Sequence, residues 1–352
     1  MRRQGVLMVV TSQARIALLG VAVVLATDGC SDTSATKVAS SSRARPRLIE
    51  QPEPASSPAA TPGTPIPALP QAPPFDAASA PMPGGPQTVV EGVSLRIAKF
   101  QRGGEPMTLW IYEPDPLPER KLPCVLVAPA GTPLVYGNEL GKGDMVEHVP
   151  YAERGYAVVA YSLDGPVARG APDSVFDVGA RKFLAAELGV ANARAAIDYI
   201  AAQLPEIDPA RIAVAGHSSA ATLALQVAEN EPRVKAAIAY APVVDLMSRF
   251  KPEDLEALAI PGLGDALKRM SPDAGISKLQ CPTFLFHADD DTNVKSEELA
   301  GFVEKLKSLN TRAVYETVEE GEHYDSMIEQ GIPKALAWLK SLPEINPPAA
   351  RS

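Results

Sequence analysis

The chain has 352 residues, 35 of them proline, and a formal net charge of −9 at pH 7. An acidic chain without a basic patch argues against nucleic acid as a partner, and three cysteines are too few for a disulfide scaffold. Thirteen of the prolines lie within residues 41–87. Such a composition cannot bury enough apolar surface to fold, so we expect one large domain after it rather than two domains.

The N-terminus has the pattern of an export signal. Three arginines precede the apolar run 16–26, which has the length of a signal-peptide core and is too short to span a bilayer. Cys30 follows a glycine, and this arrangement resembles a bacterial lipoprotein signal, in which the cysteine is lipidated. We expect residues 1–30 to be a signal peptide ending at a lipidated Cys30, which would be the only membrane contact of an exported periplasmic or cell-surface protein. The alternative is a secretory signal with an incidental cysteine, which releases a soluble protein.

The rest of the chain divides by composition and pattern. Residues 31–87 are rich in proline, alanine and serine and should form a disordered linker, residues 88–343 a folded domain, and residues 344–352 a flexible tail. Two alternating segments and then six short apolar runs have the composition of strands: 93–100, 107–112, 124–128, 157–161, 212–215, 236–241, 283–286 and 313–317. Helical patterns separate the later runs. This alternation predicts an α/β fold with a mostly parallel, eight-stranded sheet and helices on both faces.

The segment 211–220 ends a buried strand with Gly-His-Ser-Ser-Ala and continues into a helical pattern. A serine at this junction is typical of a nucleophile elbow, where strand and helix approach so closely that the residues two before and two after the serine must be small. Gly216 and Ala220 meet that requirement. Ser218 is therefore the candidate nucleophile, and the amide of Ser219, at the start of the helix, is a candidate donor to an oxyanion. The alternative is a plain strand-to-helix turn.

A serine hydroxyl needs a base to take its proton, and the chain has four histidines. His323 follows the last expected strand in a glycine-containing loop that can place an imidazole over the sheet edge, so it is the candidate base. His217 lies inside the elbow and should point away from the serine. His148 has the setting of a surface or packing residue, and His287 is expected to shape the loop that follows its strand.

The base in turn needs a carboxylate that orients it. Three aspartates follow the strand 283–286, and the order serine, aspartate, histidine along the chain is that of the α/β-hydrolases. We choose Asp291 as the acid, with Asp289 and Asp290 as alternatives or as residues that cap the loop. A metal site formed by the three carboxylates is the competing hypothesis. No partner cluster accompanies them, so we expect neither a metal nor another cofactor.

Together these segments resemble the prolyl-oligopeptidase and dienelactone-hydrolase-like branch of the α/β-hydrolase superfamily. The resemblance covers nearly all of residues 107–340, and four segments carry it: 208–218 (D-x-x-R-I-x-x-x-G-x-S), 240–246, 271–291 and 321–323. It implies the α/β-hydrolase fold, with Ser218 as nucleophile, Asp291 as acid and His323 as base.

The chain departs from this branch in features that bear on function. The turn after the third strand reads Pro-Ala-Gly-Thr instead of His-Gly-Gly. The second oxyanion donor there is a backbone amide, which we place at Gly131 or Thr132. Dienelactone hydrolases of the branch use a cysteine nucleophile. Oligopeptidases of the branch carry an N-terminal propeller, which we do not expect the residues before 88 to form.

The preferred hypothesis is a serine hydrolase that cleaves carboxylic esters, small or carbohydrate-linked, through an acyl-enzyme. A serine peptidase of the prolyl-oligopeptidase type is the second hypothesis. The third is a catalytically inactive, surface-tethered binding protein on the same fold.

Overall fold

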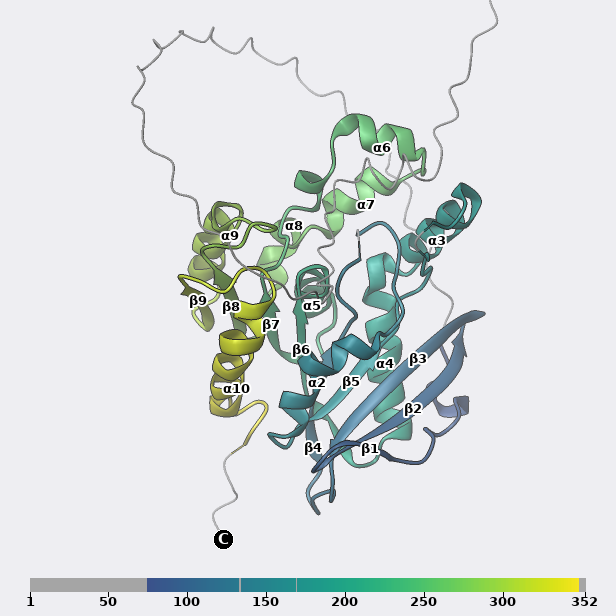
Figure 1. Ribbon diagram of the computed structural model, residues 1–352, viewed down its shortest axis with the longest axis vertical. Coiled ribbons are helices and arrows are strands. Elements are labelled where there is room, and N and C mark those ends of the chain that lie inside the picture. Colours follow the sequence, from purple (N-terminus) through teal and green to yellow (C-terminus); the bar gives the residue numbers. More distant parts are fainter. Residues whose placement is uncertain (1–74, 133, 169, 348–352) are drawn as a thin grey trace, which may run out of the picture. The chain divides into compact units, whose positions relative to one another are not determined.

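The computed structural model describes residues 75–132, 134–168 and 170–347 (Figure 1). The expected signal peptide, Cys30 and most of the expected linker lie outside the described residues, as do residues 348–352 of the expected tail. In the part of the chain that is described, no helix has both the length and the apolar character needed to cross a bilayer.

A single mixed sheet organises the domain, in the order β1-β2-β3-β5-β4-β6-β7-β8-β9. The strands are β1 (Gln87–Val90), β2 (Val93–Arg102), β3 (Glu105–Pro114), β4 (Leu122–Val127), β5 (Ala157–Tyr161), β6 (Ile207–His217), β7 (Val234–Tyr240), β8 (Thr283–Ala288) and β9 (Ala313–Val318). Strands β1 to β3 pair antiparallel, β3 also pairs antiparallel with β5, and all pairings from β5 to β9 are parallel. The predicted α/β fold with a mostly parallel sheet is confirmed.

The expected number of eight strands is wrong, because the described residues form nine. The additional strand is β1, whose four residues are mostly exposed. An edge strand of this kind buries one face at most and therefore lacks the continuous apolar run by which the inner strands are found.

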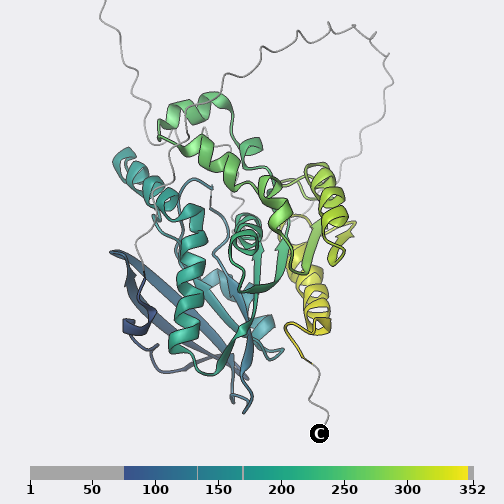
Figure 2. The ribbon, with the colours of Figure 1, turned by 180° about the vertical axis from the view of Figure 1, so that it is seen from behind.

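Helices cover both faces of the sheet. The helices of the described ranges are α2 (Met145–Ala152), α3 (Asp173–Ala185), α4 (Val190–Gln203), α5 (Ser219–Asn230), α6 (Pro252–Leu258), α7 (Leu263–Met270), α8 (Pro272–Gly275), α9 (Ser296–Leu309) and α10 (Ile332–Ser341). Helices α2 and α10 pack on the face that is in front in Figure 1, whereas α4, α5 and α9 pack on the other, seen in Figure 2. Both faces need cover because successive side chains of an inner strand point to opposite sides. In β4, Cys124 and Leu126 belong to one apolar cluster, and Val125 and Val127 belong to the other.

Residues 75–86, which composition assigned to the linker, lie against the domain. The ring of Phe75 stacks on Phe100 of β2 with centroids 4.9 Å apart, and Phe100 stacks on Tyr199 of α4 at 5.1 Å. The Tyr199 hydroxyl donates a hydrogen bond to the carbonyl oxygen of Pro81 at 2.7 Å. At the other end, Ile345 is fully buried although it lies in the expected tail. Aromatic stacking and hydrogen bonds thus hold residues 75–86, and burial of an aliphatic side chain holds Ile345, in segments that overall composition describes as linker and tail.

Candidate active site

Ser218 occupies a strained turn between β6 and α5. Its φ of 55° and ψ of −120° lie outside the regions that residues with a side chain normally adopt. The amide of Ser218 donates a hydrogen bond to the carbonyl oxygen of Tyr240 on β7 at 2.9 Å, and this bond ties the turn to the neighbouring strand. A Cβ at Gly216 would lie 2.3 Å from the Ala220 carbonyl oxygen, so only glycine fits. The close approach of strand and helix thus accounts for the small residues of the elbow.

A hydrogen bond joins Ser219 of the elbow to the turn that follows β4. The amide of Thr132 donates to Oγ of Ser219 at 3.0 Å, and both side chains are buried. Asn138 Nδ2 donates to the carbonyl oxygen of Ala130 at 3.0 Å. Gly131, between these two fixed points, has a φ of +76°, which favours glycine. The turn at 130–132 is therefore held from both sides, and the Thr132 amide already has an acceptor.

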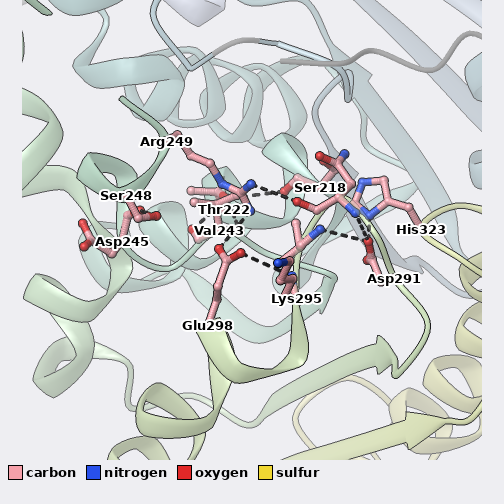
Figure 3. A network of polar contacts seen from close by, with 12 residues as sticks. Ser218, Thr222, Val243, Asp245, Ser248, Arg249, Asp291, Lys295, Glu298 and His323 are labelled. Carbon is pink, nitrogen blue, oxygen red and sulfur yellow. Dashed lines mark hydrogen bonds and ion pairs between the residues drawn. The ribbon is translucent and has the colours of Figure 1, made fainter. Parts of the chain in front are cut away.

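His323 and Asp291 form a close pair. The Nδ1 atom of His323 lies 2.7 Å from Oδ2 of Asp291 (Figure 3). The Nε2 atom of His323 is buried and has no hydrogen-bond partner among the described residues. The imidazole is thus oriented at one nitrogen and unpaired at the other.

The Asp291 carboxylate is buried but well satisfied. Its Oδ1 accepts hydrogen bonds from the amides of Asn293 and Val294 at 2.8 and 2.9 Å. Burial by itself raises the pKa of Asp291, but the hydrogen bonds from His323, Val294 and Asn293 outweigh it and hold this pKa below its ordinary value. The carboxylate is therefore ionised at neutral pH.

Asp289 and Asp290, the two neighbouring aspartates, do not bind the His323 imidazole. Asp290 accepts hydrogen bonds from the amides of Gly321 and Glu322 at 3.0 and 2.8 Å, so it holds the loop that carries His323. Asp289 is exposed. No group of three or more histidine, cysteine, aspartate or glutamate side chains in the described ranges could hold a metal ion.

The other histidines support the site or the core. Burial, with a smaller contribution from His323, lowers the pKa of His217 to about 3, and its Nε2–H donates to the His323 carbonyl oxygen at 2.7 Å. His287 donates from Nε2 to the Val294 carbonyl oxygen at 2.7 Å and so shapes the acid loop, as the sequence suggested. His148 is buried on α2, where burial lowers its pKa to about 3, so of the two roles expected for it packing is the one observed.

Sequence reasoning missed two polar side chains that contact this site. Asn138 holds the turn at 130–132, and Arg249 donates to the carbonyl oxygen of Asn293 in the acid loop at 2.9 Å. Neither residue belongs to a local motif, and each acts on a segment distant in sequence. No signal in a single sequence marks them.

The sequence profile of the prolyl oligopeptidase family matches residues 145–342, which is more than half of the chain. The chain belongs to the prolyl oligopeptidase family. It shares this family and the α/β-hydrolase fold with serine hydrolases. The resemblance stated from the sequence is therefore confirmed. No curated protein matches the chain.

Solved structures of peptidases and esterases share the fold of this prolyl oligopeptidase family member. A puromycin-hydrolyzing peptidase of Mycobacterium tuberculosis is 21% identical with a TM-score of 0.56, covering 72% of this chain and 40% of that one. An S-formylglutathione hydrolase from Agrobacterium tumefaciens is 17% identical with a TM-score of 0.55, covering 73% and 98%. An acetyl xylan esterase from Paenibacillus sp. R4 is 15% identical with a TM-score of 0.53, covering 74% and 90%. The chain thus spans about 40% of the length of the peptidase.

Proposed function

We propose that the protein hydrolyses carboxylic esters with Ser218 as nucleophile, His323 as general base and Asp291 as the orienting acid. One observation carries the proposal. The His323 imidazole is bound to Asp291 at Nδ1, while its Nε2 is buried and unpaired among the described residues. A base that takes the serine proton needs this arrangement, with one nitrogen fixed and the other open.

The reaction proceeds by acyl transfer to water. Ser218 Oγ attacks the ester carbonyl while Nε2 of His323 takes its proton, and Asp291 stabilises the resulting imidazolium. The proton then passes from Nε2 to the leaving alkoxide, which departs as the alcohol. A water molecule, deprotonated by the same nitrogen, attacks the acyl-enzyme, and the proton returns to Ser218 as the acid is released.

Two backbone amides are proposed to bind the developing oxyanion. The first is that of Ser219, because the first amides of a helix have no acceptor within the helix. The sequence left Gly131 and Thr132 open as the second donor. The Thr132 amide is already bound to the Ser219 hydroxyl, which favours Gly131.

Structural matches support an ester substrate. The S-formylglutathione hydrolase and the acetyl xylan esterase share this fold over at least 90% of their own length. Family membership favours a second function, a serine peptidase, and a carbohydrate-linked ester is a further substrate class to test.

One assay separates these functions from an inactive binding protein. Hydrolysis of p-nitrophenyl acetate and of a proline-containing peptide amide is measured for the full chain, for Ser218→Ala and for the control Ser308→Ala on the exposed end of α9. We expect ester turnover that falls roughly 10⁴- to 10⁶-fold in Ser218→Ala and is unchanged in Ser308→Ala. Turnover of the peptide alone would establish the peptidase. Ester turnover that survives in Ser218→Ala would overturn the assignment.

We also propose, from the N-terminal pattern alone, that the protein is exported and tethered through Cys30. Labelling of cells with a tagged fatty acid should mark the wild-type protein and not Cys30→Ser. Export of an unlabelled wild-type protein would instead support the soluble, secreted alternative.

A further inference from the structure

Arg249 lies outside the proposed triad but contacts the loop that holds the acid. It ends the 3-10 helix η4 (Leu246–Arg249). Its Nη1 donates to the carbonyl oxygen of Asn293 at 2.9 Å, and its Nη2 lies 3.1 Å from Oε2 of Glu298 (Figure 3). Its Nε is buried with no hydrogen-bond partner among the described residues. The guanidinium therefore joins two elements, η4 and the start of α9.

The turn that Arg249 binds is the one that receives the Asp291 carboxylate. The amides of Asn293 and Val294 both donate to Oδ1 of Asp291, and the carbonyl oxygen of Asn293 accepts from Arg249. A turn that supplies two donors to a carboxylate positions that carboxylate only if the turn itself is fixed. Arg249 fixes it from outside.

Arg249 is in turn attached to the helix behind the nucleophile. The amide of Val243 donates to Oγ1 of Thr222 at 3.0 Å, and Thr222 lies one turn after Ser218 on α5. Asp245 then caps η4, accepting from a backbone amide of that helix at 2.9 Å. Polar contacts and a short stretch of chain thus lead from the nucleophile helix to the acid loop (Figure 3).

We infer that Arg249 is a positioning residue for the acid–base pair, holding the turn at 291–294 so that Asp291 reaches Nδ1 of His323. Its kinetic consequences rest on the proposed function. Arginine suits this task because its planar fork binds a carbonyl and a carboxylate at once. Lysine keeps the charge but offers a single point of contact, so it replaces only part of the function.

The kinetic test uses Arg249→Gln and Arg249→Lys in the full chain, with p-nitrophenyl acetate as substrate and rates normalised to titrated active sites. For Arg249→Gln we expect kcat to fall on the order of 10- to 100-fold with KM little changed, because a misplaced acid leaves the imidazole misoriented. The acidic limb of the kcat/KM profile should move to lower pH, since the imidazolium loses part of its stabilisation. Arg249→Lys should lie between this variant and the wild type.

The matched control is Arg312→Gln. Arg312 also binds one carbonyl and one carboxylate, at 2.9 and 2.5 Å, but these belong to Gln280 and Glu344, away from the acid loop. We expect it to change neither kcat nor the pH profile. If Arg249→Gln lowers the melting temperature and leaves both kinetic quantities unchanged, Arg249 is only structural and the inference is overturned.

A spectroscopic test needs no substrate and so separates this inference from the proposed function. The proton between Nδ1 of His323 and Asp291 should give a downfield NMR resonance in the wild type and in Arg312→Gln. Arg249→Gln should shift that resonance upfield or broaden it by exchange with water. An unchanged resonance in a folded Arg249→Gln overturns the positioning function, even if no ester turnover is found.

Discussion

The nucleophile and the acid–base pair are held in place by different forces. Ser218 sits in a turn fixed by steric fit, where backbone atoms of Ala220 leave no room for a side chain at Gly216. Asp291 and His323 lie on two loops after β8 and β9 that are fixed by side-chain hydrogen bonds. The elbow is therefore held mainly by close packing, and the two loops are held mainly by hydrogen bonds.

This difference predicts which kind of substitution should disrupt the structure of each region. A steric constraint fails when volume is added, and the backbone of strand and helix must then move together. A hydrogen-bonded loop fails when an acceptor is removed, and it loosens without displacing the sheet. Substitutions of either kind therefore test whether the two regions are supported independently.

The largest effect is expected from adding one methyl group to the elbow. In Gly216→Ala the new Cβ must move about an ångström away from the Ala220 carbonyl oxygen, so we expect a loss of about 3 kcal/mol in the free energy of unfolding. The displaced Ser218 should lower kcat/KM at least roughly 100-fold. Urea unfolding and ester hydrolysis measure the two effects.

Gly301→Ala on α9 is the matched control, since nothing lies within 4 Å of a Cβ there. It should keep full activity and gain about 0.5–1 kcal/mol in stability, because alanine favours the helix. A Gly216→Ala variant as stable and active as this control would show that the elbow is not sterically fixed.

A smaller effect is expected from removing the acceptor that holds the His323 loop. Asp290→Ala leaves the amides of Gly321 and Glu322 without their carboxylate, so the loop should loosen and kcat/KM should fall roughly 10-fold. We expect a stability loss of about 2 kcal/mol, as for hydrogen bonds to a charged group.

Asp289→Ala, on the exposed neighbour, controls for the loss of negative charge near the site. It should change activity by less than about twofold, in the range of ordinary surface substitutions. Equal losses of kcat/KM in Asp290→Ala and Asp289→Ala would mean that the negative charge near His323, and not the contact between the loops, supports activity.

The smallest effect concerns pH and compares one buried glutamate beside each region. Burial is the main cause that raises the pKa of Glu147, near the His323 loop, and of Glu229, on α5, to about 8. Each is protonated in the folded protein at neutral pH but ionised in the unfolded chain. Stability therefore falls as pH rises from the unfolded value of 4.5 toward 8, and each residue contributes about 1 kcal/mol of this loss between pH 7 and 8.

Glu147→Gln and Glu229→Gln should each remove one of these contributions. The measurement is the free energy of unfolding in urea between pH 7 and 8, where the histidines of the unfolded chain, with an ordinary pKa of 6.5, are mostly neutral. Each variant should show a shallower decline than the wild type, and both together a shallower one still. A slope that neither variant changes would show that these carboxyls are ionised in the folded protein.

Much of the site could be predicted because its demands are local. The elbow needs small residues at fixed spacing around Ser218, and such a pattern is written in consecutive residues. The choice of Asp291 among three adjacent aspartates rested on position alone. The structure gives a physical distinction, since Asp291 contacts the imidazole and Asp290 contacts the backbone of the opposite loop.

By itself the sequence determined the alternation of strands and helices, the elbow and the order of the candidate residues, because burial periodicity and tight turns depend on near neighbours. Tertiary structure alone decided that residues 75–86 pack on the domain, that the Thr132 amide is bound to Ser219, and that Arg249 reaches the acid loop. Each of these contacts joins segments more than 20 residues apart. Their pairing depends on how the sheet brings loop ends together, and no local pattern specifies that.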